Sequence, residues 1–304
     1  MARAGSANTS TDEAPGQRRF GLSVPSLPPG RAGDPGLFGP SSIVWRVNRE
    51  RALVLSAPAV AVLQLAHPLV AAAVAEHTDR RRSAAERLGA TVGLNLAVIF
   101  GDREQAERAA SHVRDLHTRV NGRLGTETGP FPAGSLYRAD DPELLLWAHA
   151  TMVWAGVECY ARFVGPLAPA ERDRYVADMR PFGAAFGLDA VPLPSTFADL
   201  QAYVSSMVEG NVLAAGDEGR QEAKEILWPT GTWGERAAGP AMRIVTAGLL
   251  PDAVRRAFAL PWGRRQRAAF SVLGGASRGA VRTMPRRFRW WPHYRTACAR
   301  VGGP

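Results

Sequence analysis

Long apolar stretches rich in alanine, leucine and valine run through the chain, and proline and glycine residues separate them. The longest of these runs cover residues 52–74 and 142–165. Neither run alternates apolar with polar residues between hairpin turns, which is the pattern of a half-buried strand. The pattern therefore predicts an all-α fold.

The run over 52–74 is apolar enough to raise the question of a membrane span, but it contains Pro58, Gln64, His67 and Pro68. A proline removes a backbone hydrogen-bond donor, and each polar group costs free energy in hydrocarbon. We therefore expect a pair of core helices broken near Pro58 and Pro68, and no transmembrane helix. The second run is interrupted in the same way, by Glu143, His149 and Glu158.

The chain has 304 residues, of which 46% are hydrophobic, so it is long enough to bury a sizeable core. No linker divides it, and we expect one domain over residues 37–304. Residues 1–36 hold few apolar residues and many glycines, prolines, serines and threonines. Such a segment cannot bury enough surface to offset the entropy of ordering, so we expect a disordered N-terminal tail.

Cysteine usage and the absence of an export signal bear on the compartment. Cys159 and Cys298 are the two cysteines of the chain, which excludes a disulfide framework and agrees with a reducing compartment. Arg18 and Arg19 suggest a twin-arginine signal, but no apolar segment and no small-residue cleavage site follow them. We therefore expect a cytoplasmic protein.

Positive charge is concentrated at the C-terminal end. Residues 251–304 hold twelve arginines and one acid, Asp252, whereas the whole chain has a net charge of +9. The sharpest part, RTMPRRFRWWPHYR at 282–295, sets arginines beside tryptophans, as at a membrane interface. We expect most of these arginines to pair with acids elsewhere. Lys224 is the single lysine, which indicates codon bias, and we expect no nucleic-acid partner.

His117 is the residue with the most specific surroundings. Val113 and Val120 lie four residues before it and three after it, so a helix would turn the imidazole toward its apolar face. Arg87 and Thr91 are four residues apart and share another helical face. An imidazole, a guanidinium and a hydroxyl suit a haem, whose iron takes an axial histidine and whose propionates take hydrogen bonds. The alternative is a core histidine that bonds a carbonyl oxygen.

Several longer segments occur in a recognisable order. They are FGPSSIVWRVNRERALVL (38–55), LQLAHPLVAAAVAEHT (63–78), LHTRVNG (116–122), YRADDPELLLWAHATMV (137–153) and LPSTFADLQAYV (193–204). Together with the Arg87/Thr91 pair they resemble the haem-dependent oxygenase family that includes the latex clearing protein (rubber oxygenase) and the endoplasmic-reticulum-bound oxygenase of the mycophenolic acid pathway. The resemblance runs from about Phe38 to about Arg300.

This resemblance implies a single all-α, globin-like domain that holds a haem b and oxidises apolar substrates with dioxygen. The family's proximal iron ligand falls on His117, and its arginine and threonine fall on Arg87 and Thr91. The rubber-cleaving members carry a lysine directly before that threonine, able to ligate the iron from the distal side. This chain has Ala90 there, so rubber cleavage is not carried over.

Other residues offer alternatives. His67 precedes a proline and could bond an orphan carbonyl oxygen or line a distal pocket, and His149 could line the haem pocket or compete with His117. Cys159 as a thiolate ligand is disfavoured because Glu158 lies beside it. Asp140 and Asp141, which precede a proline, are interpreted as a helix N-cap and not as catalytic acids.

The sequence thus leaves three hypotheses. The first is a haem b oxygenase in which His117 binds iron, Arg87 neutralises a propionate or orients oxygen, and Thr91 donates a hydrogen bond to either, with an apolar, isoprenoid-like substrate. The second is a haem-binding or sensing protein without turnover. The third is a cofactor-free basic protein that contacts a membrane interface through residues 251–304.

Overall fold

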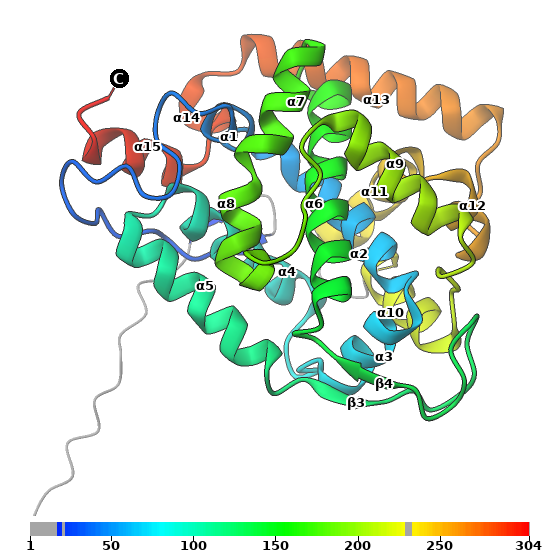
Figure 1. The fold of residues 1–304 in the computed structure, drawn as a ribbon. Coiled ribbons are helices and arrows are strands. Elements are labelled where there is room, and N and C mark those ends of the chain that lie inside the picture. Colours follow the sequence, from blue (N-terminus) through cyan, green and yellow to red (C-terminus); the bar gives the residue numbers. More distant parts are fainter. Residues whose placement is uncertain (1–16, 20–21, 229–232, 304) are drawn as a thin grey trace, which may run out of the picture.

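The computed structural model describes residues 17–19, 22–228 and 233–303, and nearly all of its elements are helices (Figure 1). The prediction of an all-α fold is confirmed, with two small antiparallel hairpins added. The helices are α1 (Ile43–Asn48), η1 (Arg51–Ser56), α2 (Ala57–Leu65), α3 (Pro68–His77), α4 (Ala84–Phe100), α5 (Arg103–His117), α6 (Pro142–Phe163), α7 (Pro169–Asp178), α8 (Arg180–Gly183), η2 (Ala184–Leu188), α9 (Phe197–Glu209), α10 (Asp217–Leu227), α11 (Trp233–Leu249), α12 (Asp252–Ala257), α13 (Arg264–Thr283), α14 (Arg286–Arg289) and α15 (Pro292–Arg300). The strands are β1 (Gln17–Arg19), β2 (Leu22–Val24), β3 (Asn121–Arg123) and β4 (Leu136–Arg138).

Helix α6 is the central element of the core. Its first turn is fixed by Asp141, whose side chain accepts a hydrogen bond from the Glu143 amide at 2.8 Å, and by Pro142 at the first helical position. The N-cap interpretation of Asp141 is therefore confirmed. Helix α6 packs against η1, α2, α9 and α13, and it lies at the middle of the ribbon in Figure 1.

The apolar run over 52–74 folds as the expected broken pair. Helix α2 has Pro58 in its first turn, and α3 begins at Pro68 after a break at His67. Among the described residues no single helix is long and apolar enough to cross a membrane; η1 and α2 pass that test only together with α3, from which they are bent by 109°. Val62 and Leu63, in the middle of the pair, are fully buried in the core.

Residues 22–36 are ordered against the domain, which differs from the expected tail. Strand β2 lies on α4 at two glycines: a Cβ atom at Gly93 would lie 2.8 Å from Cδ of Pro25, and one at Gly89 would clash with the Ser23 carbonyl. The Arg31 amide donates to Asp102 at 2.6 Å. Close backbone approach to the two glycines and hydrogen bonds hold this segment in place. A prediction based on the number of apolar residues takes account of neither.

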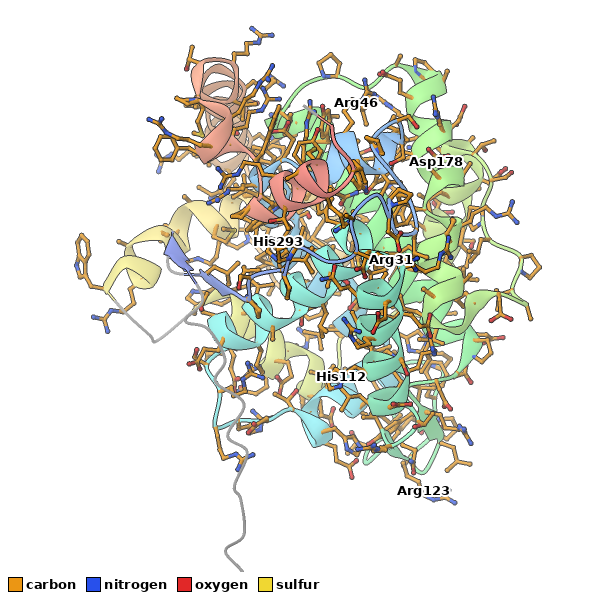
Figure 2. The ribbon with its side chains drawn as sticks, turned by 90° about the vertical axis from the view of Figure 1, so that its left-hand side faces the viewer. Arg31, Arg46, His112, Arg123, Asp178 and His293 are labelled. Atoms are coloured by element: carbon orange, nitrogen blue, oxygen red, sulfur yellow. The ribbon has the colours of Figure 1, made fainter. Side chains whose placement is uncertain are left out.

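The same N-terminal segment also meets the last helix of the chain. The His293 Nε2 atom lies 2.9 Å from the Pro25 carbonyl oxygen, and the Gly33 amide donates to the Arg300 carbonyl oxygen at 2.8 Å. Figure 2 labels His293 and Arg31 on this side of the molecule. The two ends of the described chain are therefore packed together.

Glu50 is a fully buried carboxylate at the junction of α1 and η1. Arg289 donates to both of its oxygens, from Nε at 2.6 Å and from a terminal nitrogen at 2.8 Å. The Trp290 indole donates to it at 3.1 Å, and Arg49 Nε lies 3.5 Å away. Two cations and an indole from both ends of the domain thus compensate one buried charge.

Most C-terminal arginines are not paired with acids. Among the described residues, ion pairs join two of the twelve to carboxylates, Arg255 to Asp252 and Arg289 to Glu50. The expectation that most of them pair with acids is wrong. Several others donate instead to backbone carbonyls or lie over an aromatic ring, and Arg278, Arg286 and Arg300 are examples.

We predict that Arg289→Ala lowers the free energy of unfolding by about 3 kcal/mol, because it leaves the Glu50 carboxylate buried without its main partner. Urea denaturation followed by circular dichroism measures the change. Arg287→Ala is the matched control, since Arg287 is exposed, and its effect is expected to stay within about 0.5 kcal/mol. Equal, small effects of the two substitutions would show that Glu50 needs no partner.

Candidate functional site

Helices α4 and α5 carry the predicted site residues and follow each other in the chain. The two helices contact each other and are joined by Gly101 and Asp102 alone. Asp102 caps α5 by accepting from the Gln105 amide at 2.7 Å, and the Gln105 side chain accepts from the Asp102 amide. Arg87 lies near the start of α4 and His117 at the end of α5, so each is at the end of its helix that is remote from this turn.

His117 is the last residue of α5 and is half-buried. The chain leaves the helix at Thr118, so Val120 does not share a helical face with His117, and that part of the expectation is wrong. Burial lowers the pKa of His117, and the charge of nearby Asp140 opposes part of that shift. The imidazole is therefore mostly neutral at neutral pH, which is the form that binds iron.

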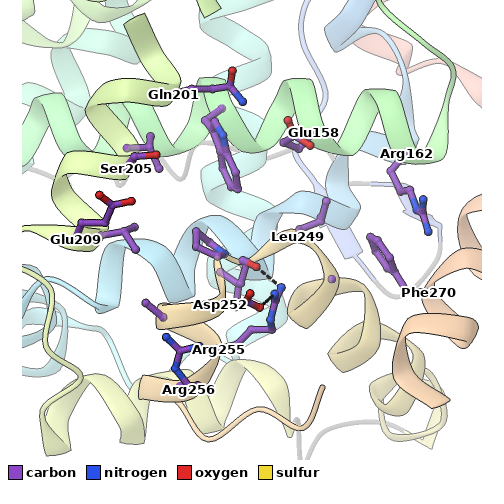
Figure 3. A pocket seen from close by; sticks show the side chains of 17 residues that line it. Glu158, Arg162, Gln201, Ser205, Glu209, Leu249, Asp252, Arg255, Arg256 and Phe270 are labelled. Atoms are coloured by element: carbon purple, nitrogen blue, oxygen red, sulfur yellow. Dashed lines mark hydrogen bonds and ion pairs between the residues drawn. The ribbon is translucent and has the colours of Figure 1, made fainter. Parts of the chain in front are cut away.

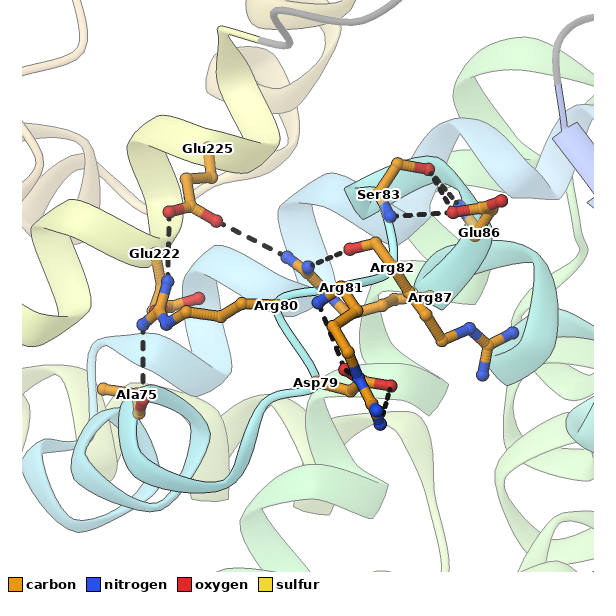
Figure 4. A network of polar contacts seen from close by, with 10 residues as sticks. All are labelled: Ala75, Asp79, Arg80, Arg81, Arg82, Ser83, Glu86, Arg87, Glu222 and Glu225. Carbon is orange, nitrogen blue, oxygen red and sulfur yellow. Dashed lines mark hydrogen bonds and ion pairs between the residues drawn. The ribbon is translucent and has the colours of Figure 1, made fainter.

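Arg87 is engaged by helix α10. Its guanidinium lies 3.6 Å from the Glu225 carboxylate and donates to the Arg82 carbonyl oxygen at 2.8 Å (Figure 4). Arg80 continues this network with 2.6 Å to the buried Glu222 and 3.2 Å to Glu225. The Arg87 guanidinium is thus held in an ion-pair network between α4, the loop before it and α10.

Thr91 is exposed, and its hydroxyl donates to the Arg87 carbonyl oxygen at 3.1 Å. This bond runs along the α4 backbone and leaves the hydroxyl one turn from Arg87. Ala90, where the rubber-cleaving relatives have lysine, is half-buried on the same helix. Within the described part of the chain no hydrogen bond or ion pair joins His117 to Arg87 or Thr91.

Two further histidines lie on or near the first half of α6. His149 lies two turns into α6 and is buried, and His67 is buried at the α2–α3 break. Burial lowers the pKa of each to about 4, and the charge of Asp141 partly opposes the shift at His67. The region therefore holds neutral imidazoles beside the acidic N-terminus of α6, at Asp140 and Asp141.

The same region holds buried polar atoms without partners. His67 Nδ1, His149 Nδ1 and Trp147 Nε1 each lack a hydrogen bond in the described structure. Unsatisfied buried polar groups are rare in native folds and call for an explanation such as a bound group or an ordered water. Both histidines are candidates from the sequence, whereas nothing in the sequence pointed to the unsatisfied indole of Trp147, two residues before His149.

A π-helical turn closes one side of this region. In η2, Gly187 has φ of 99°, and the Arg114 side chain of α5 donates to the Ala185 carbonyl. A Cβ atom at Gly183 would lie 3.4 Å from His149 Nδ1, so glycine leaves room for the ring. Single π-helical turns are frequent at functional sites. No signal in the sequence had pointed to this turn.

Two hollows of the described structure lie elsewhere. One, of about 730 Å³, lies between α6, α9, α12 and α13 and is lined by Trp154, Glu158 and Arg255 among others (Figure 3). A second, of about 440 Å³, lies beside α10 around Leu227. Neither is lined by Arg87, Thr91 or His117. The α6 residues that line the larger hollow, Trp154, Glu158 and Arg162, belong to the half of α6 that is remote from Asp141.

Cys159 does not offer a thiolate. It is fully buried on α6, and burial raises the pKa of its thiol to about 12. Its sulfur lies 3.6 Å from the Ala52 carbonyl oxygen, as a weak donor. Among the described residues no three histidines, cysteines or acids come close enough together to hold a bare metal ion.

A comparison with models of known protein families gives a match. A family model described as "ER-bound oxygenase mpaB/B'/Rubber oxygenase, catalytic domain" matches residues 45–279 of the chain. The match spans α1 to most of α13 and includes all the helices that surround the histidines. Neither the curated proteins nor the solved structures give a match.

We predict that the stability of the protein falls as the pH is lowered from 6.5 toward 4. His67, His149 and His293 each have a folded-state pKa of about 4, so over this range the unfolded chain takes up protons that the folded protein does not. Each histidine then removes about 1.4 kcal/mol of unfolding free energy per pH unit. Urea titrations at several pH values measure the slope.

The contribution of one histidine can be isolated by substitution. His149→Gln should make the slope shallower by that amount. His112→Gln is the control, because His112 is exposed on α5, where Figure 2 labels it, and it should keep the wild-type slope. An unchanged slope in His149→Gln would contradict the assignment of a buried, neutral imidazole.

Proposed function

We propose that this chain, which belongs to the family of the ER-bound oxygenase mpaB/B' and rubber oxygenase catalytic domains, is a haem b-dependent oxygenase. The proposed domain is globin-like in its use of helices to hold the haem. The substrates are dioxygen and an apolar, isoprenoid-like molecule. The family membership supports the oxygenase chemistry, and the residues around α6 support the cofactor.

The observation that carries the cofactor proposal is the group of neutral imidazoles at the start of α6. His117 is half-buried with a lowered pKa, and His149 Nδ1 and His67 Nδ1 are buried without partners. Haem iron can take an axial imidazole in its neutral form, and one of these residues would supply it. His117 is the proposed ligand because it falls on the proximal position in the family resemblance, and because its ring is the least enclosed of the three.

A bound haem would supply the oxidising chemistry, and the protein's part is to bind, orient and exclude water. Around His117, the Asp140 carboxylate opposes the drop in pKa and so keeps the imidazole a stronger base than burial alone would leave it. The alanines and leucines of α3, α5 and α6 provide an apolar surrounding for the substrate. Ala109 and Leu144 are examples, and both are buried.

Arg87 is proposed to neutralise a haem propionate or orient oxygen, with Thr91 donating a hydrogen bond beside it. In this structure Glu225 holds the guanidinium, so the role requires Arg87 to exchange that carboxylate for a propionate. The exchange replaces one carboxylate partner by another, so the charge and the type of hydrogen bond at Arg87 stay the same. Ala90 supplies no amine to the distal side, and for this reason cleavage of rubber is not part of the proposal.

We predict that His117→Ala yields folded protein with little haem, because one imidazole holds the iron. Absorption spectra of the protein as purified, with haem quantified as the pyridine complex, provide the measurement. His112→Ala, five residues earlier on α5 and exposed, should keep the wild-type haem content and spectrum. Normal haem loading in His117→Ala, with loss in His149→Ala, would transfer the ligand role to His149.

We predict that Arg87→Leu loses haem or oxygen-dependent turnover, whereas Glu225→Gln, which removes the other half of the ion pair, keeps both. The pair itself is expected to contribute about 0 to 1 kcal/mol, since both side chains reach the surface. Haem titration and oxygen consumption with an isoprenoid substrate compare the variants. If both variants behave alike, Arg87 serves the ion pair alone. If the wild-type protein binds haem but consumes no oxygen, the result would favour a haem-binding or sensing protein without turnover.

A further inference from the structure

The outward face of α13 carries positive charge without compensation. Arg264 and Arg265 are exposed in its first turn and Arg282 in its last, and none of the three has a hydrogen bond or ion pair in the described structure. Asp252 is the only acid from residue 251 to the end of the chain, and it is already paired with Arg255. The charge of this face is therefore available to a partner.

Between these arginines the same face is apolar. Helix α13 turns Gly274 and Val281 inward, where both are buried. The positions that point away from them are exposed and hold small or apolar side chains, namely Ala268, Val272, Gly275, Ala276 and Gly279. Val272 has 69% of its surface exposed, which is high for a large apolar residue. Over 20 residues such a helix is about 30 Å long.

Helix α14 extends the face. Arg286 and Arg287 are exposed, and the guanidinium of Arg287 lies 4.8 Å from the ring of Phe288, which is 40% exposed. Figure 1 shows α13 and α14 at the same edge of the molecule, away from α5 and β3. We call the exposed residues of these two helices the α13–α14 face.

We infer that the α13–α14 face binds the surface of a membrane that contains anionic lipids. Arginines at both ends of a surface helix attract phosphate and carboxylate headgroups, and the apolar stripe between them contacts the acyl boundary. A nucleic acid would need polar or cationic side chains along the whole face to follow its phosphates, and this stripe has none between Arg267 and Arg278 except Ser271 and Ser277. The charge complementarity therefore favours a bilayer.

The test is co-sedimentation of the full chain with vesicles of phosphatidylcholine alone and of phosphatidylcholine mixed with phosphatidylserine. We expect binding to the mixed vesicles, weakened by salt, and little binding to phosphatidylcholine. The variant Arg264→Gln/Arg265→Gln/Arg282→Gln/Arg286→Gln should lose at least tenfold in affinity. Val272→Asp should weaken the binding that survives at high salt.

The matched control removes the same number of charges from the opposite edge: Arg103→Gln/Arg108→Gln/Arg119→Gln/Arg123→Gln, all exposed on or beside α5 and β3. It should bind mixed vesicles like the wild type, and thermal melts confirm that both variants are folded. Equal losses in the two variants would overturn the inference in favour of net charge alone. Absence of vesicle binding, or tighter binding to a DNA duplex than to mixed vesicles, would also overturn it.

Discussion

One buried carboxylate, that of Glu50, constrains how the two ends of the domain meet. A charge in the core is tolerated only where cations and hydrogen-bond donors surround it. Arg289 and Trp290 supply these donors from 239 and 240 residues further along the chain. The helix pair that follows Glu50 and the segment that follows α13 must therefore be in place together. The C-terminal helices are thus part of the core, although their composition is that of a basic surface.

The same cost of burying charge explains the state of the histidines. The buried carboxylate of Glu50 keeps its charge because two cations lie beside it. The histidines have no such compensation, so burial lowers their pKa and they remain neutral, and the charges of Asp141 and Asp140 oppose only part of that shift at His67 and His117. A neutral, poorly satisfied imidazole is a candidate ligand for a metal that arrives with its own macrocycle. Helix α6 thus links stability and proposed function, since it supports both η1 and the histidines.

Local features of the fold could be predicted from the sequence, because they depend on neighbours. The break at Pro68 and the N-cap at Asp141 follow from the residues beside them. The site could be predicted in its residue types and not in its contacts. Glu225 lies 138 positions after Arg87, and nothing local indicates that it holds that guanidinium. Likewise, residues 22–36 are ordered because two glycines of α4 admit them, which a count of apolar residues does not register.

The arginines of the C-terminal segment show the limit of composition most clearly. Arg287 and Arg289 are two residues apart, yet one lies on the surface over Phe288 and the other lies against the buried Glu50. A short helix turns neighbouring side chains to different sides, so one run of arginines serves both the core and the outward face. The inward arginine is fixed by a single acid that no other cation can reach as well. The outward ones form no ion pair with an acid among the described residues, and their charge is left for whatever the α13–α14 face meets.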